Sequence, residues 1–257
     1  MQAARRRGRG YPLRPVQLCM FHPVDHPMER GWVGRVDGDR VVHLAAQTLQ
    51  SFFTGGGSAR EHAEYPLEAV CLLAPVLHPL SVRVFERQDA FAFANPAAIV
   101  GPRAEIDPGA RTARHRSPSG SEPQAPLVLL PRLAGVIGAG GTIAGFTCFG
   151  EWRYPAHQLP KDRDFALGLG PVVVTPDALD PVGLEAVARV GRDEHRRGRL
   201  PRFDWAAARD LAETGTVLRA GDVLAGPSLD PVPVSPGSDV ELEIEGIGVL
   251  AASVAEA

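Results

Sequence analysis

The side chains that could do chemistry in this sequence are a few cations and acids near the middle of the chain. Arg132 and Lys161 are cations, Glu151 is an acid between them, and His157 lies close by in the sequence. A guanidinium beside a lysine could bind a carboxylate or stabilise an enolate, in the manner of an oxyanion site. Glu151 or His157 could then carry a proton. The elements that position these residues therefore decide whether they form a site.

Cysteines do not add a second kind of chemistry. Cys19, Cys71 and Cys148 are widely separated and odd in number. Since the sequence has no CxxC pair, neither a zinc ribbon nor a thioredoxin-like site is expected. Each cysteine lies among apolar residues, which is the usual setting of a reduced thiol in a core. We therefore expect a cytoplasmic protein.

The composition is that of an ordinary globular chain. Its 257 residues are 44% hydrophobic and 22% charged, with a formal net charge of -3, which gives no reason to expect nucleic acid as a partner. Arginines occur at positions 5, 6, 7 and 9, and we interpret residues 1–15 as a disordered basic leader. Because no apolar run reaches about 18 residues, no membrane span is expected.

Short apolar runs bounded by turn residues predict a β-rich fold. Glycine (28) and proline (24) are both abundant, as in β-rich proteins. Residues 32–36 and 40–44 predict a hairpin, and the Asp37-Gly38 step between them favours a type I′ turn. The alternation of apolar and acidic residues in 240–244 predicts a strand with one face in solvent.

Helical patterns are scarce, and one segment carries no pattern at all. Helices are expected at residues 184–190 and 203–214, the second beginning near Asp204 and ending at Gly215. Residues 103–126 contain a basic cluster and many Ser, Pro and Gly residues. A stretch of this length without periodicity predicts a functional or disordered loop.

Several short segments follow one another along most of the chain. They are residues 36–44 (VDGDRVVHL), 72–76 (LLAPV), 91–102 (FAFANPAAIVGP), 133–138 (LAGVIG), 143–147 (IAGFT), 161–165 (KDRDF), 218–223 (LRAGDV) and 246–250 (GIGVL). In this order they resemble segments of the fumarylacetoacetate hydrolase family. Any one of them is weak evidence, but their common order makes the resemblance strong.

The resemblance implies a fold and a class of chemistry. The fold is a β-rich α+β mixed β-sandwich roll with a small N-terminal β domain, here residues 16–75, followed by a catalytic-type domain at residues 76–257. Family members are commonly homodimers. They use Mg²⁺ or a similar cation to bind a β-dicarbonyl or 2-oxo acid, and they then hydrolyse a C–C bond, decarboxylate or move a double bond.

The residues that hold the family's metal are largely replaced. Its Glu-x-Glu pair falls on Leu130 and Arg132, neither of which can bind Mg²⁺. Its third carboxylate falls on Glu151, and Gln88 stands where the resemblance places a water-activating histidine. Ser228 lies near the position of a missing threonine. We therefore expect neither the family's metal nor another cofactor.

Two functions and one alternative alignment remain open. The first is a metal-independent enzyme for enolisation, isomerisation, cyclisation, decarboxylation or C–C cleavage, with Arg132, Glu151 and Lys161 as catalytic residues. Its substrate contacts would be His157, Arg153 and Ser228. The second is a non-catalytic relative that serves as a binding module or as the partner subunit of an active paralogue. The sequence favours the enzyme slightly, because Glu151 and Lys161 persist within recognisable motifs.

The third reading is an alignment shifted by a few residues, so that Glu122, Asp162 or Asp164 completes a metal site. The three readings predict different structures. A metal-independent enzyme requires Arg132, Glu151 and Lys161 to converge on a closed pocket. A non-catalytic relative would have a filled or open pocket and a large apolar interface. A shifted alignment would bring three carboxylates to one point.

Overall fold

The computed structural model describes residues 16–96, 98–106, 127–155, 157–159 and 161–256. The predicted leader, and residues 107–126 of the predicted loop, lie outside the described residues. Strands dominate the described part, as the sequence predicts. They are β1 (Gln17–Pro23), β2 (Trp32–Asp37), β3 (Arg40–Ala45), β4 (Ser58–Pro66), β5 (Val70–Leu73), β6 (Val82–Arg87), β7 (Ala90–Ala94), β8 (Ala98–Val100), β9 (Ala104–Ile106), β10 (Leu127–Ile137), β11 (Ile143–Arg153), β12 (Ala166–Val174), β13 (Glu185–Val190), β14 (Asp193–Arg199), β15 (Val223–Ala225), β16 (Val232–Val234), β17 (Asp239–Ile244) and β18 (Gly248–Val254).

Short helices connect these strands within the described ranges. The α-helices are α1 (Leu49–Phe53) and α3 (Trp205–Glu213), and the 3-10 turns are η1 (Leu67–Ala69), η3 (Ala139–Gly141) and η4 (Lys161–Arg163). Asp204 caps α3 by accepting hydrogen bonds from the backbone N–H groups of Ala206 and Ala207. This cap satisfies two of the amide groups that a helix leaves unpaired at its start.

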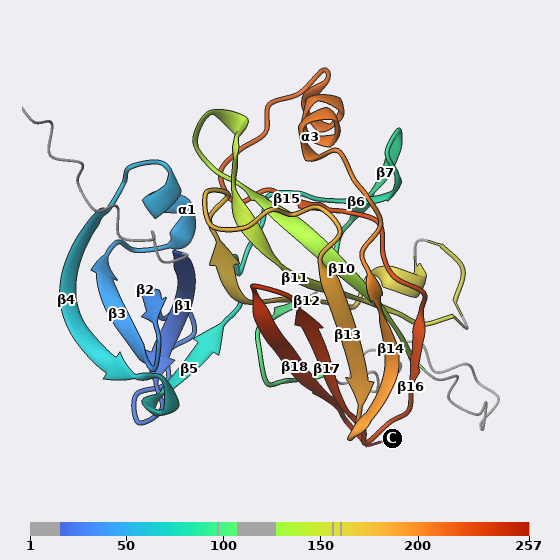
Figure 1. The fold of residues 1–257 in the computed structure, drawn as a ribbon, viewed down its shortest axis with the longest axis horizontal. Coiled ribbons are helices and arrows are strands. Elements are labelled where there is room, and N and C mark those ends of the chain that lie inside the picture. Colours follow the sequence, from blue (N-terminus) through green and yellow to red (C-terminus); the bar gives the residue numbers. More distant parts are fainter. Residues whose placement is uncertain (1–15, 97, 107–126, 156, 160, 257) are drawn as a thin grey trace, which may run out of the picture.

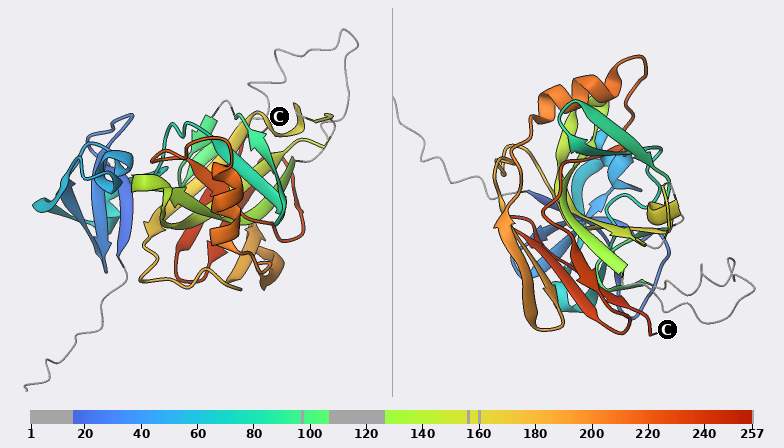
Figure 2. Two further views of the ribbon diagram at one scale, coloured as in Figure 1. Left: turned by 90° about the horizontal axis from the view of Figure 1, so that it is seen from above. Right: turned by 90° about the vertical axis from the view of Figure 1, so that its right-hand side faces the viewer.

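The described residues form two sheets. The larger has 13 strands in the order β4-β3-β2-β1-β12-β11-β10-β15-β6-β7, with β16, β5 and β8 paired to its side, and the smaller runs β14-β13-β17-β18-β9. Most pairs are antiparallel, but β8 with β12, β6 with β15 and β9 with β18 are parallel. β17 and β18 of the smaller sheet pack across β11 and β12 (Figures 1 and 2). The fold is the β-rich mixed roll that the sequence predicts.

The first five strands and α1 stand to one side of this roll (Figure 1). β1 links them to it through the pairs Gln17 with Val174 and Leu18 with Val173. The larger sheet therefore continues from the N-terminal strands into the roll. The boundary near residue 75 remains a prediction, placed where β5 ends and the chain runs toward β6.

The predicted hairpin, exposed strand and second helix are confirmed, with one correction to the turn. β2 and β3 pair around Gly38 and Asp39, and β17 alternates buried and partly exposed residues. Only Gly38 of the two turn residues has a positive φ, of 65°. A type I′ turn needs positive φ at both, so the predicted turn type is wrong. Gly215, with φ of 72°, follows α3 as predicted.

The predicted helix at residues 184–190 is wrong, because this segment forms β13. It pairs with β14 on one edge and β17 on the other. Glu, Ala and Leu favour a helix, but Val187 and Val190 favour a strand. Two neighbouring strands supply hydrogen-bond partners along the whole segment, and this tertiary pairing overrides the local preference.

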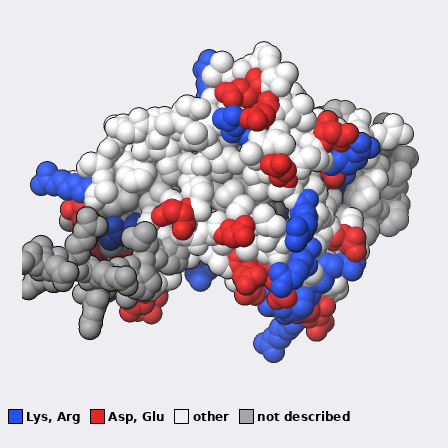
Figure 3. Space-filling model, turned by 45° about the horizontal axis from the view of Figure 1, so that its top comes forward, with Lys and Arg blue, Asp and Glu red and all other residues white. Residues whose placement is uncertain are grey.

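Three further features of the described structure are its free cysteines, its short helices and its mixed surface charge. Cys19 and Cys148 are buried and all three cysteines are free, and burial raises the pKa of the Cys19 thiol to about 12. No helix in the described ranges is long and apolar enough to cross a membrane. On the face drawn in Figure 3, acidic and basic side chains are interspersed, and much of the surface is neither.

Candidate functional site

Strands β10 and β11 bring the two central predicted residues together. The strands run antiparallel with Leu130 directly opposite Glu151. Residues two apart on a strand point to the same face, so Leu130, Arg132 and Glu151 share one face of this pair. Arg132 and Glu151 are each 0% exposed. The pairing register therefore buries a guanidinium next to a carboxylate.

The Arg132 guanidinium donates four hydrogen bonds, with at least one from each of its three nitrogen atoms. Its Nε donates to Glu151 Oε2 at 2.8 Å. Its Nη1 donates to the carbonyl oxygens of Phe85, at 3.1 Å, and Gly226, at 2.9 Å. Its Nη2 donates to Glu86 Oε1 at 2.9 Å. Since a guanidinium has five N–H groups, four of them are already engaged within the protein.

Glu151 and Glu86 are linked a second time by Arg153. Arg153 Nε donates to Glu151 Oε1 at 2.9 Å, and its Nη2 donates to Glu86 Oε1 at 2.5 Å. Glu86 thus bridges Nη2 atoms of two arginines, while both oxygens of Glu151 accept hydrogen bonds. The Glu86 side chain is 51% exposed, whereas that of Arg153 is 21% exposed. The bonded groups run from the core at Arg132 to the surface at Glu86.

Electrostatics favour the charged forms at the surface end of this arrangement. Burial raises the pKa of Glu86, but the charges and hydrogen bonds of Arg132 and Arg153 outweigh it and hold that pKa below its ordinary value. Burial lowers the pKa of Arg153, but Glu151 and Glu86 raise it above its ordinary value. Opposite charges at hydrogen-bond distance produce such shifts, so Glu86 and Arg153 form an ion pair at neutral pH.

A second layer adds one more cation and one more acid. Arg163 Nη1 lies 3.5 Å from Glu151 Oε1, and Arg163 Nε lies 3.7 Å from Asp162 Oδ1. Asp162 Oδ2 lies 4.0 Å from Arg153 Nη1. We call the full set the ion-pair network: Glu86, Arg132, Glu151, Arg153, Asp162 and Arg163. Its three positive and three negative groups balance.

Lys161 does not join this network. Its Nζ lies 2.6 Å from Asp164 Oδ2, and its side chain is 60% exposed. The predicted meeting of Arg132 and Glu151 is therefore confirmed, and the predicted approach of Lys161 to them is wrong. The i,i+3 spacing of Lys161 and Asp164 in the turn at η4 explains this, because it lets the lysine pair locally.

The predicted substrate contacts are spread around the network. Arg153 is part of it. His157 is exposed, and its ring lies 4.9 Å from that of Tyr154. Ser228 is partly exposed and follows Gly226, whose carbonyl binds Arg132, by two residues. Their roles in binding remain predictions.

Sequence reasoning missed Glu86 and Arg163 as members of the network. Glu86 belongs to the segment where the family resemblance places a histidine, at Gln88. Gln88 itself binds the backbone of Asp204 with its amide, donating to the carbonyl at 3.0 Å and accepting from the N–H at 2.9 Å. It thereby fixes the β6–β7 turn to the start of α3. The sequence signal that could have found them is the arginine at position 132, where the resemblance places a carboxylate. A buried guanidinium there would need acidic partners nearby.

The residues on this face do not fit the divalent cation that the resemblance implies. Leu130 offers no oxygen, and the Arg132 guanidinium would repel a cation at the point where oxygen ligands are needed. The acids Glu86, Glu151 and Asp162 each face an arginine. No cluster of three or more His, Cys, Asp or Glu residues able to hold a metal occurs in the described part of the chain. Glu122 lies outside that part, and Asp164 pairs with Lys161.

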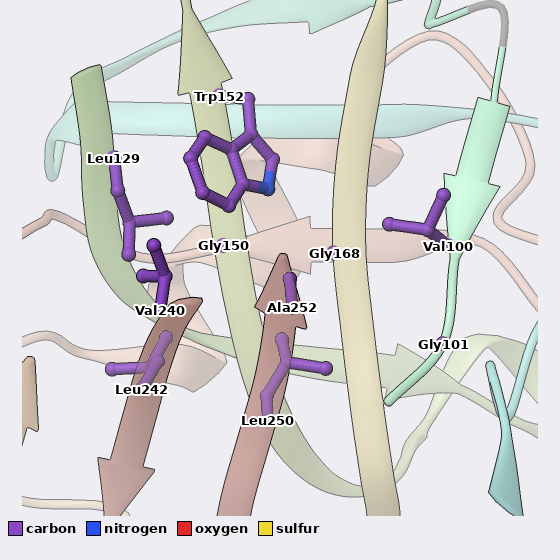
Figure 4. Close-up of a pocket in the computed structure, with 10 residues that line it drawn as sticks. All are labelled: Val100, Gly101, Leu129, Gly150, Trp152, Gly168, Val240, Leu242, Leu250 and Ala252. Carbon is purple, nitrogen blue, oxygen red and sulfur yellow. The ribbon is translucent and has the colours of Figure 1, made fainter. Parts of the chain in front are cut away.

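An apolar cavity lies on the other side of β10 and β11, between the two sheets. Its volume is about 10 Å³, roughly the space of one water molecule. All of its lining residues are apolar or glycine, including Leu129, Trp152, Val240 and Leu250 (Figure 4). Packing between the sheets, and not ligand binding, explains this small gap.

Comparisons with known proteins agree with the fold. Residues 134–255 match the family model for the fumarylacetoacetate (FAA) hydrolase C-terminal domain. The structure is similar to that of 2-hydroxyhepta-2,4-diene-1,7-dioate isomerase from Mycobacterium marinum, with 20% identity, a TM-score of 0.74, and coverage of 94% of this chain and 98% of the other. A search of curated protein sequences gave no significant match.

Two hydrolases share the same architecture. Maleylpyruvate hydrolase from Sphingobium sp. SYK-6 is 19% identical, with a TM-score of 0.70 over 94% of this chain and 100% of the other. Fumarylacetoacetate hydrolase from Exiguobacterium antarcticum is 20% identical, with a TM-score of 0.73 over the same shares. At such identities the likeness establishes the fold.

Proposed function

We propose that this chain is a non-catalytic member of the fumarylacetoacetate hydrolase family, whose C-terminal model residues 134–255 match, and that it acts by binding. The observation that carries the proposal is the position of Arg132. Its buried guanidinium fills the face where the resemblance places metal ligands, and it donates four hydrogen bonds to protein groups. With four of its five N–H groups engaged in this way, Arg132 stabilises the fold and has little left to offer a substrate.

The rest of the network supports the same proposal. Glu151 is 0% exposed, and its two oxygens accept from Arg132 and Arg153. A carboxylate that acts as a base must reach the proton that it removes. Here substrate would first have to displace two arginines from Glu151. The network is therefore better suited to holding β6, β10 and β11 together than to proton transfer.

Metal-independent enolisation of a β-dicarbonyl or 2-oxo acid is the second candidate, and Glu86 is the observation that favours it. Glu86 is half exposed and bridges Nη2 atoms of Arg132 and Arg153. A substrate carboxylate could take its place between the same two donors. Glu151, directly behind, would then be the group to accept a proton during isomerisation, cyclisation, decarboxylation or C–C cleavage.

Calorimetry and a turnover assay separate these candidates. Purified protein is titrated with Mg²⁺ and Mn²⁺, with and without oxaloacetate, and oxaloacetate consumption is followed in parallel with EDTA present. The non-catalytic proposal predicts no metal binding and no consumption above the uncatalysed rate. Consumption in EDTA that Glu151→Gln abolishes would instead establish the metal-independent enzyme.

A restored variant provides the matched control. Leu130→Glu with Arg132→Glu returns two carboxylates to the face shared with Glu151. Binding of Mn²⁺ by this variant but not by the natural chain would show that positions 130 and 132 account for the lost metal site. Tight binding of either ion by the natural chain would overturn the proposal.

A partner subunit must also associate with another chain. We further propose a homodimer, which light scattering behind a sizing column would test. The side chains of Leu80 and Phe93 are 70% and 64% exposed, and both lie at the same end of the β6–β7 hairpin, since Phe93 pairs with Arg83. These two exposed apolar side chains would supply the apolar contact that association requires.

A further inference from the structure

A second cavity, which no residue of the ion-pair network lines, lies between the N-terminal strands and the chain segment that leads to β6. Its volume is about 370 Å³, within the range of sites for small molecules. Residues from four parts of the chain line it, among them Met20 on β1, Glu29 and Arg30 in the β1–β2 connection, Gln50 on α1, and Leu77 and His78 before β6.

The polar groups of this cavity are available to a ligand. In the part of the chain that the structure describes, the side chains of Glu29, Arg30, Gln50 and His78 make no hydrogen bond or ion pair. The ion-pair network is the opposite case, because its arginines and acids bind one another. Glu29, Arg30 and His78 are exposed and Gln50 is partly exposed, so their polar ends are open to a ligand, and a few such groups are the usual means by which a site orients its ligand.

The other wall of the cavity is apolar and fixed in place. Met20 is 2% exposed on β1, an interior strand of the larger sheet, and its flexible thioether adapts to the shape of an apolar group. A Cβ added to Gly221 would lie 2.4 Å from Gln50 Cγ, so the turn before β15 presses directly against Gln50. The roll therefore holds one side of the cavity, and the N-terminal strands hold the other.

From these observations we propose that this cavity binds a small zwitterion of the α-amino acid type, independently of the function proposed above. Arg30 binds the carboxylate, Glu29 binds the ammonium group, and Met20 and Leu77 receive the apolar side chain. Adjacent residues of opposite charge line one cavity without pairing. Both are exposed, and a ligand with a single charge would engage only one of them. A zwitterion satisfies both.

Thermal-shift measurements with the standard amino acids, followed by calorimetry of those that stabilise the full-length protein, test this proposal. At least one apolar amino acid, such as L-leucine or L-methionine, is expected to raise the melting temperature at millimolar concentration. Its singly charged analogues, 4-methylpentanoate and 3-methylbutylamine for leucine, should bind at least about tenfold more weakly.

Substitutions locate the site. Arg30→Gln and Glu29→Gln should each weaken binding at least about tenfold, while Arg40→Gln, an exposed arginine paired with Glu64, should leave it unchanged. The proposal is overturned if no amino acid binds, if 4-methylpentanoate binds as tightly as leucine, or if Arg30→Gln binds like the natural chain. None of these results depends on the ion-pair network, so they leave the proposed function to its own test.

Discussion

Replacing Arg132 by methionine should destabilise the protein more than any surface substitution. The Arg132 side chain is 0% exposed and so is that of Glu151. Removing one member of a buried ion pair costs about 3–5 kcal/mol, because the other charge stays buried with less compensation. The carbonyls of Phe85 and Gly226 would also lose their donor. These losses share one side chain and do not add, so we expect a total of about 3–5 kcal/mol.

Guanidinium unfolding followed by circular dichroism measures this loss directly. The free energy of unfolding of a domain is about 5–15 kcal/mol, so the midpoint should move to a clearly lower denaturant concentration. Arg40→Met is the matched control, because Arg40 forms an exposed pair with Glu64, and exposed pairs contribute little.

The double variant Arg132→Met/Glu151→Gln tests the cause. Its loss in free energy of unfolding should be smaller than the sum of the losses of the two single variants by at least about 1 kcal/mol. The reason is that each buried charge is removed together with its partner. A loss below about 1 kcal/mol for Arg132→Met, or strictly additive losses in the double variant, would refute the claim that this pair holds the site together.

Three further outcomes follow from the structure. Asp204→Ala should cost about 1 kcal/mol in urea unfolding, because it removes the α3 cap; an unchanged midpoint would contradict this. Burial, and next the charge of His62, lower the pKa of His43 below its ordinary 6.5; its contribution to stability is thus present above pH 6.5 and lost as pH falls through the lowered value. His43→Phe should flatten the melting temperature between pH 7 and 5 relative to the natural chain. Gly145→Ala should cost about 1–3 kcal/mol by overpacking, since a Cβ would lie 2.5 Å from the Val174 carbonyl oxygen; a small loss in thermal unfolding would show that the strands can shift.

The sequence was most informative where local signals agree with the tertiary structure. The hairpin around Gly38 and the helix that begins after Asp204 carry their own turn and cap residues, so they could be predicted without knowing their neighbours. The strand at residues 185–190 could not, because its pairing with β14 and β17 decides its conformation. Local propensity is a weak guide when both edges of a segment gain hydrogen bonds from other strands.

The candidate site could be predicted only in part for a similar reason. The resemblance aligned Arg132 and Glu151 with ligand positions of one metal site, and their contact follows from that alignment. Glu86 comes from β6, 46 residues before Arg132 in the chain, and nothing local to it indicates an ion pair. Lys161 matches its motif, yet it pairs with Asp164 three residues away. A motif thus predicts the backbone path better than the direction of a long flexible side chain.

The short contact between β1 and β12 also has a consequence for shortened forms of this protein. Every residue of β12 is buried, and one edge of its C-terminal end is covered by Gln17 and Leu18 of β1. Removing the N-terminal strands would leave that edge with free backbone amides and carbonyls along an apolar strand. Such an edge is a template for pairing with other chains. A roll produced without residues 16–75 is therefore expected to aggregate, and the N-terminal strands act as its solubilising cover.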